Sequence, residues 1–383
     1  MPTPLRVHLL ISSLTWGGAE TLLTHLAVGA PAAGLELSVG YLLDLDGSPA
    51  AAGLRANGVE PELVGVRTLL APADLRRVRR HVAAAAPDVL HTHLGYADLM
   101  GGVAARSLGV PSVATIHVMD RSTGARERVK DELMALARRR CAERVICVSE
   151  AARRWYLATG WDRAEHVVVV QNGVAAGRVA PGESERLRRA LGLAASDVVV
   201  TMLGVLRPGK GHDVAVAATS VLRARFPELR LLIAGDGPAR AEVAALAARL
   251  GPAAVLTGHR DDTAAILAAS DVLLHPTARD AFPSAVLEAM AAGLPTVTTA
   301  VGGISEIVRD GETGALVAAP ASVEAVIGAL GRLLGDAALR RRMGAAARRR
   351  FDERFTAERW ATRLRAVYEA AGARGGARSG ASP

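Results

Sequence analysis

The sequence predicts an α/β protein with two domains, each built on a doubly wound parallel sheet. Short, apolar, β-branched runs alternate with longer helical patterns, and this alternation occurs twice along the 383 residues. Half of the residues are hydrophobic and only 3% are aromatic, which suits cores packed with small aliphatic side chains. The length is sufficient for two domains that each bury a core.

The predicted strands form one set in each half of the chain. In the first half they cover residues 6–12, 36–43, 88–93, 112–117, 144–149 and 166–171. In the second half they cover residues 198–204, 229–234, 254–257, 271–275, 296–301 and 314–317.

Turn residues and the last helical pattern set the predicted domain boundaries. The chain becomes rich in turn residues after Asn172, so we expect a first domain over 1–175 and a second over 176–355. Residues 356–372 have a helical pattern, and 373–383 have the composition of a disordered tail.

Charge and cysteine content restrict the class of protein only loosely. The net charge of +8 permits an anionic partner, but lipid headgroups, nucleic acid and sugar diphosphates all have the required sign. Cys141 and Cys147 are too few for a disulfide framework, which favours a reducing, cytoplasmic location. The apolar start of the chain is too short for a membrane span and lacks a cleavage pattern, so we interpret it as the first strand.

The richest segment of the chain places a carboxylate pair after a buried strand. The run VLLH ends before Pro276, and a short helical pattern begins near Ser284. Asp280 lies in the loop between them and Glu288 lies about one turn inside the helix. Two carboxylates in this arrangement can accept hydrogen bonds from hydroxyl groups of one ligand. Gly302 and Gly303 follow the next strand, where backbone amides can approach a phosphate or a sugar.

A second Gly-rich loop opens the second domain. Gly204, Gly209 and Lys210 match most of a nucleotide-binding P-loop, but Gly211 stands where that motif needs a Ser or Thr to hold magnesium. The chain has only two lysines, Lys130 and Lys210, although arginine is abundant. Keeping a lysine in this loop indicates a point-charge role.

The first domain contributes a Gly-rich loop at its first strand. Gly17 and Gly18 precede an amphipathic helix, which gives the outline of an anion site. The loop does not have the glycine spacing of a dinucleotide-binding motif, so a dehydrogenase is poorly supported.

Three histidines lie near strand ends of the first domain. His91 and His93 share one face of their strand, but no third zinc ligand is apparent, so packing or hydrogen bonding is the better interpretation. His117 closes the next strand, at the edge where parallel sheets form their ligand crevice.

These motifs resemble those of retaining glycosyltransferases of the GT-B fold, especially glycosyltransferase family 4. The resemblance is carried by the carboxylate pair Asp280 and Glu288, the Gly302-Gly303 loop and the Gly-Gly-Ala-Glu segment that contains Gly18. Family members usually have Glu at the first position of the pair, and Asp280 is shorter by one methylene. The resemblance implies two Rossmann-like domains that face a central cleft.

The resemblance also implies a role for each motif residue. The implied catalytic residues are His117 and Asp280 at the donor sugar and Glu288 at the ribose. The resemblance implies that Gly18 lies near the phosphate and the acceptor. It also implies that the diphosphate is bound by the donor-binding residues Arg207, Lys210, Gly302 and Gly303. We expect no metal or other cofactor, because these groups replace the metal that neutralises the leaving group in other transferases.

The expected function is transfer of a sugar, with retention, from a UDP- or GDP-sugar to a hydroxyl acceptor. The acceptor is expected to be a glycan or a lipid-linked molecule in cell-surface glycan, exopolysaccharide or glycolipid synthesis, and nucleic acid is not an expected partner. The segment from Arg121 to Arg144 includes a basic helix with apolar residues, which can contact anionic lipid or simply pack on the core. Two alternatives remain: a nucleotide-sugar epimerase on the same fold, and an inactive homologue that binds nucleotide sugars.

Overall fold

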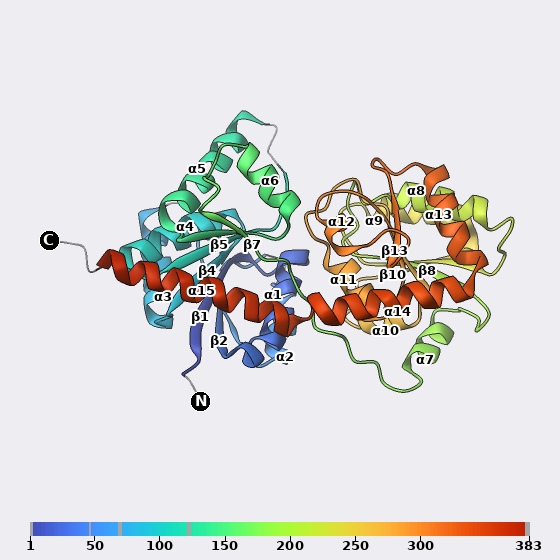
Figure 1. The fold of residues 1–383 in the computed structure, drawn as a ribbon, viewed down its shortest axis with the longest axis horizontal. Helices are drawn as coiled ribbons and strands as arrows, with labels where there is room; N and C mark the ends of the chain where they lie inside the picture. Colours follow the sequence, from blue (N-terminus) through green and yellow to red (C-terminus); the bar gives the residue numbers. More distant parts are fainter. Residues whose placement is uncertain (1–2, 46, 68–70, 121–123, 380–383) are drawn as a thin grey trace. The chain divides into compact units, whose positions relative to one another are not determined.

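The computed structural model describes residues 3–45, 47–67, 71–120 and 124–379. The chain divides into two compact units (Figure 1). The first unit comprises residues 1–175 with 356–383, and the second comprises residues 176–355. Each unit contains one parallel sheet with helices on its two faces, so the predicted α/β class is confirmed.

The first unit has a sheet with the strand order β3-β2-β1-β4-β5-β6-β7, and every paired strand is parallel. Its strands are β1 (Leu5–Ser13), β2 (Leu35–Leu43), β3 (Pro61–Leu63), β4 (Val89–His93), β5 (Ser112–Ile116), β6 (Arg144–Cys147) and β7 (Val167–Val169). Its α-helices are α1 (Gly18–Gly29), α2 (Ala51–Ala56), α3 (Pro72–Ala85), α4 (Gly95–Leu108), α5 (Ala125–Cys141), α6 (Glu150–Ala158) and α15 (Ala357–Ser379). The short strand β3 was not predicted, because three residues are too few to show a period-2 pattern.

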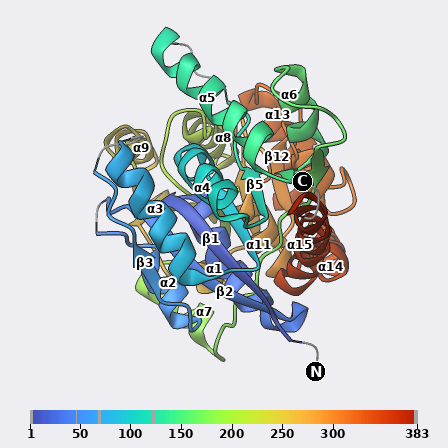
Figure 2. The same cartoon turned by 90° about the vertical axis from the view of Figure 1, so that its left-hand side faces the viewer.

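Helices α3, α4 and α5 pack side by side, and α1 packs separately against α15 (Figure 2). Glycine also lets α4 lie close to the sheet: a Cβ on Gly101 of α4 would be 2.7 Å from the side chain of Leu10 on β1. The described helices include none that is long and apolar enough to cross a membrane.

The second unit repeats the arrangement with the order β10-β9-β8-β11-β12-β13. Its strands are β8 (Val198–Leu203), β9 (Leu229–Ala234), β10 (Ala254–Gly258), β11 (Val272–His275), β12 (Thr296–Thr299) and β13 (Gly314–Val317). Its α-helices are α7 (Glu183–Ala190), α8 (His212–Leu222), α9 (Arg240–Ala247), α10 (Thr263–Ala268), α11 (Ser284–Ala291), α12 (Ile304–Ile307), α13 (Val323–Gly335) and α14 (Ala337–Arg354). Short 3-10 helices cover Pro31–Ala33 in the first unit and Ala248–Ala253 in the second.

The end of the chain corrects one prediction. Helix α15 continues to Ser379, so residues 373–379 are helical rather than part of a disordered tail. Alanine and arginine are strong helix formers, and they offset the glycines that suggested disorder. Residues 380–383 of the predicted tail lie outside the described part of the chain.

Both sheets reverse their strand order at the same place. The crossovers run outward in opposite directions from β1 and β4 in the first unit, and from β8 and β11 in the second. Loops after neighbouring strands therefore leave a crevice at this point of a doubly wound sheet, and ligands bind there. All the predicted site residues follow the carboxyl ends of strands or lie on the helices that come next.

Candidate functional site

In the second unit, the loop after β8 is shaped by glycine. Gly211 has a φ of +76°, and a Cβ at this position would be 2.3 Å from the carbonyl oxygen of Pro276. A Ser or Thr is therefore excluded by both backbone conformation and space. The magnesium-binding hydroxyl of a P-loop cannot be built here, which removes that interpretation of the motif.

The same loop is tied to the loop after β11. The amide of Ala278 donates to the carbonyl oxygen of Gly209 at 2.7 Å, and the Thr277 hydroxyl donates to the same oxygen at 3.3 Å. These bonds hold the two loops together at the point where the strand order reverses.

Lys210 and Asp280 form an ion pair between these two loops. The Lys210 Nζ atom lies 2.8 Å from Asp280 Oδ2, and both side chains are about 15% exposed. Burial raises the pKa of Asp280, but polar contact with His275 and the charge of Lys210 lower it more, and the net effect holds this pKa well below its usual range. Asp280 is therefore ionised at neutral pH and is paired with the ammonium group of Lys210.

His275 approaches the same carboxylate oxygen from the end of β11. Its Nε2 atom lies 3.5 Å from Asp280 Oδ2, which is long for a hydrogen bond, and this buried nitrogen has no hydrogen-bond partner among the described residues. Burial lowers the pKa of His275, so the ring is neutral. A buried polar nitrogen of this kind needs a partner, and a ligand can supply one.

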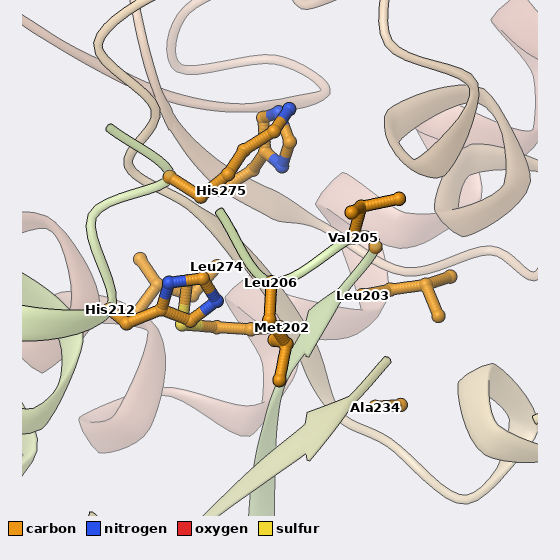
Figure 3. Close-up of a pocket in the computed structure, with 10 residues that line it drawn as sticks. Met202, Leu203, Val205, Leu206, His212, Ala234, Leu274 and His275 are labelled. Atoms are coloured by element: carbon orange, nitrogen blue, oxygen red, sulfur yellow. The ribbon is translucent and has the colours of Figure 1, made fainter. Parts of the chain in front are cut away.

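A small hollow lies beside this group. Figure 3 shows the rings of His212 and His275 at its edge, together with apolar side chains of β8 and β11. Lys210 and the backbone of Gly204 complete its polar lining. Burial lowers the pKa of His212 as well, so Lys210 is the cation of this hollow and both imidazoles are neutral hydrogen-bonding groups.

The remaining predicted residues of the second unit follow β8, β11 and β12 along the chain. Arg207 is exposed in the loop after β8, and Glu288 is half-buried on α11. Gly302 has a φ of +53°, a conformation that favours glycine. The amide of Gly303 donates to the carbonyl oxygen of Ala281 at 3.0 Å, so it is used within the protein and only a local shift would release it for a phosphate.

In the first unit, the loop after β1 has one crowded and one open glycine. A Cβ on Gly17 would be 2.3 Å from the carboxylate of Glu20, which folds back over the start of α1. A Cβ on Gly18 would meet nothing within 4 Å. The open space is at the residue for which a ligand contact was predicted.

The histidines of the first unit form a continuous neutral cluster. His91 has both ring nitrogens occupied, by Tyr368 Oη and Thr115 Oγ1, each at 2.7 Å. The centroid of its ring lies 4.1 Å from that of His93 at an interplanar angle of 39°, and His93 Nδ1 lies 2.8 Å from Nε2 of His117. Burial lowers the pKa of His91 to about 3 and that of His117 to about 4, and the pKa of His93 also falls well below its usual value.

Hydrogen bonds to both ring nitrogens thus account for His91, whereas His93 has a bonded Nδ1 and a buried Nε2 without a partner among the described residues. The described residues contain no group of three or more His, Cys, Asp or Glu side chains that could hold a metal ion. Cys141 and Cys147 are free thiols, and burial raises the pKa of Cys147 to about 12, so it is inert at neutral pH.

Comparison with known proteins identifies the family. The model of the family "Glycosyltransferase Family 4" matches residues 16–178, and that of "Glycosyl transferases group 1" matches residues 183–350. A 2-deoxystreptamine glucosyltransferase of Streptomyces kanamyceticus is 32% identical over 66% of this chain and 69% of its own length. The chain belongs to glycosyltransferase family 4.

Other relatives agree with this assignment. A D-inositol 3-phosphate glycosyltransferase of Actinosynnema mirum is 33% identical over 60% of each chain. The chain thus spans about 60% of the length of the first curated relatives that it matches.

Solved structures confirm the GT-B fold of this family 4 member. HepE of Anabaena, crystallised with UDP and glucose, superposes with a TM-score of 0.83 at 22% identity, over 95% of this chain and 99% of HepE. Sucrose-phosphate synthase of Thermosynechococcus elongatus superposes with a TM-score of 0.75 at 21% identity, over 96% and 100%.

The structure adds two residues to those that the sequence singled out in this family 4 protein. His275 was predicted only as the end of a strand, and His93 only as a packed or hydrogen-bonding residue. The signal that drew attention to His117, a histidine at the carboxyl end of a parallel strand, applies equally to His275. No sequence pattern could show that His93 contacts His117, because His93 ends β4 whereas His117 follows β5.

Proposed function

We propose that this family 4 protein transfers a hexosyl group from a nucleoside-diphosphate sugar to a hydroxyl acceptor, with retention of anomeric configuration. The observation that carries the proposal is the Lys210–Asp280 ion pair between two crevice loops, with neutral His275 beside it. It supplies a cation for a diphosphate and a carboxylate for sugar hydroxyls within one small volume.

The proposed roles follow from the charges. The leaving nucleoside diphosphate gains negative charge as the glycosidic bond breaks, and Lys210 and Arg207 stabilise it. Asp280 and Glu288 accept hydrogen bonds from the donor sugar and the ribose, and Gly302 allows close approach of the backbone. In the first unit, Gly18 leaves room for the acceptor and the phosphate, and His117 contacts the donor sugar. No metal is proposed, since the cationic side chains carry the electrostatic work.

The choice of donor and acceptor is guided by the relatives. HepE was crystallised with UDP-glucose, so UDP-sugars are the first donors to test and GDP-sugars the second. The relatives are named for D-inositol 3-phosphate and 2-deoxystreptamine, both hydroxylated six-membered carbocycles. We therefore include such cyclitols with glycan and lipid-linked acceptors, and we place the reaction in the cytoplasm, in synthesis of a cell-surface glycan, an exopolysaccharide or a glycolipid.

The test begins with thermal unfolding in the presence of UDP-, GDP- and ADP-sugars, with and without EDTA. A ligand that binds the folded state raises the transition temperature. We expect one nucleotide class to do so, equally with EDTA, and the shift to be lost in Glu288→Ala. No shift with any nucleotide would favour the inactive homologue.

Product analysis then separates transfer from its alternatives. Nuclear magnetic resonance of the product formed with an acceptor reports its anomeric configuration, and inversion would contradict the proposed mechanism. Formation of an epimeric nucleotide sugar without any acceptor would favour the epimerase.

We also propose peripheral contact of α5 with an anionic membrane. Val129, Leu133 and Leu136 lie on one stripe of this helix and are 60%, 43% and 48% exposed. Arg126 and Arg128 are exposed near them, so an apolar stripe and positive charge occur together. Residues 121–123 of the basic segment lie outside the described part of the chain.

Co-sedimentation with vesicles containing phosphatidylglycerol at low salt tests this contact. Leu133→Gln should weaken sedimentation. The matched change Val221→Gln, at a 57% exposed residue of α8, should leave it unchanged. Equal sedimentation of the two variants would contradict the assignment to α5.

A further inference from the structure

His93 occupies a position from which it can control the proton of His117. Its Nδ1 atom lies 2.8 Å from His117 Nε2, and the two rings stack with centroids 5.1 Å apart at an interplanar angle of 29°. Both rings are neutral, so one of them donates in this bond and the other accepts. The direction of the bond decides which nitrogen of His117 carries the proton.

The buried second nitrogen of His93 favours one direction. Nε2 of His93 has no hydrogen-bond partner among the described residues. If His117 donated, His93 would carry its own proton on Nε2, and a buried N–H would be left unpaired. If His93 donates from Nδ1, only a lone pair is left unpaired. Orphaned N–H groups are the rarer case in folded proteins, so the second arrangement is preferred.

We propose that His93 is a positioning residue for His117. Its Nδ1–H donates to Nε2 of His117, holds that ring and leaves the proton of His117 on Nδ1. His117 therefore presents an N–H donor to its ligand, and the matching group is an oxygen acceptor such as a sugar hydroxyl. The kinetic part of this inference rests on the proposed function, in which His117 contacts the donor sugar.

The surrounding structure holds His93 firmly. Its ring packs 4.1 Å from that of His91, which is itself bonded to Tyr368 and Thr115. The next residue, Leu94, has a φ of +69° and a ψ of 146°, a backbone conformation that residues other than glycine rarely adopt. Strained residues of this kind persist where the surrounding structure fixes them, and they cluster at functional sites.

The proton assignment can be measured on the unmodified protein. Long-range proton–nitrogen correlation spectra of ¹⁵N-histidine-labelled protein distinguish the two neutral forms of each ring. We expect the Nδ1–H form for both His93 and His117. An Nε2–H form of His117 would overturn the inference without any variant or substrate.

Two substitutions of His93 test its role in turnover. The amide nitrogen of Asn lies near the position of Nδ1, so His93→Asn keeps a donor, whereas His93→Leu removes it and keeps an apolar side chain. We expect His93→Leu to lose about tenfold in kcat/KM for the nucleotide sugar, which corresponds to one hydrogen bond, and His93→Asn to stay within about threefold. The His117 spectrum should change in the Leu variant alone. Thermal unfolding confirms that both variants are folded.

His117→Ala separates this inference from the proposed function. If His117→Ala impairs turnover while His93→Leu retains both kcat/KM and the His117 spectrum of the unmodified protein, the role of His93 is contradicted. If His117→Ala is as active as the unmodified protein, the proposed contact of His117 with the donor is wrong, and the spectra alone decide the proton assignment.

Discussion

The two units place different chemistry at the equivalent edge of similar sheets. In the first unit, the carboxyl ends of β4 and β5 hold neutral histidines whose pKa values are lowered by burial. In the second unit, the loops after β8 and β11 hold an ion pair whose carboxylate is kept charged. A doubly wound sheet thus supplies a position for ligand groups, and the local side chains decide whether that position is ionic or neutral.

Removing the cation of the second unit should have the strongest effect on turnover. Lys210→Ala should lower kcat/KM for the nucleotide sugar by at least about 100-fold, because a preorganised charge on the leaving group is lost. The matched control is Lys130→Ala, which removes the only other lysine; that residue pairs with Glu127 at 2.8 Å on α5. Similar steady-state kinetics for the two variants would contradict the role of Lys210 at the leaving group.

Acid should weaken the first unit more than the second. Among the described residues, burial lowers the pKa of five histidines in the first unit, His8, His81, His91, His93 and His117, and of two in the second, His212 and His275. An unfolded histidine has a pKa of about 6.5, whereas burial lowers the pKa of folded His8 and His91 to about 3. As pH falls below about 6.5, the unfolded state takes up protons first and stability declines. At pH 5, each of these two histidines should lower the free energy of unfolding by about 2 kcal/mol relative to neutral pH. Asp280 has the opposite shift, so its contribution is present above about pH 4 and is lost only at lower pH.

Intrinsic fluorescence provides the measurement. All four tryptophans, Trp16, Trp155, Trp161 and Trp360, belong to the first unit, whereas far-UV circular dichroism follows both units. Thermal unfolding curves from the two probes should separate at pH 5 more than at pH 7.5. Superimposed curves at pH 5 would contradict the predicted difference in acid sensitivity between the two units.

A smaller effect should follow when the carboxylate of the second unit is neutralised. Asp280 holds the ammonium of Lys210, and Asp280→Asn should release it for a diphosphate. We expect UDP to bind about three- to tenfold more tightly, while sugar transfer falls because the sugar loses a hydrogen-bond acceptor. Calorimetric titration with UDP measures the affinity, and Asp280→Glu, which keeps the charge, is the control. Weaker binding of UDP to the Asn variant would mean that Lys210 does not meet the diphosphate.

The smallest effect concerns backbone strain in the first unit. Non-glycine residues with positive φ, among those described, are Ser48, Ala86 and Leu94, and all belong to this unit. At Leu94, replacement by Gly should give a protein about 1 kcal/mol more stable than replacement by Ala, which reverses their usual order. Urea unfolding of the two variants tests this, and the usual order would show that Leu94 is not strained.

The amino-acid sequence was sufficient to predict the α/β class, the positions of most strands, the family and the residues on which the proposed site rests. Apolar β-branched runs and glycine-marked turns are local patterns, so one chain reveals them. It could not show β3, which is too short for a period, or the helical state of residues 373–379, where alanine and arginine outweigh glycine.

The contacts between distant residues became visible only in the folded chain. Lys210 and Asp280 are separated by 70 residues along the chain, and His93 and His117 by 24, yet each pair is within 2.8 Å. Loops packed across strands produce three further features. They bury and so neutralise the histidines, they place the carbonyl oxygen of Pro276 where residue 211 must be glycine, and they bring the Gly303 amide to the carbonyl oxygen of Ala281. Parallel neighbours are joined by long crossovers, so their contacts are nonlocal and leave no pattern in a single sequence.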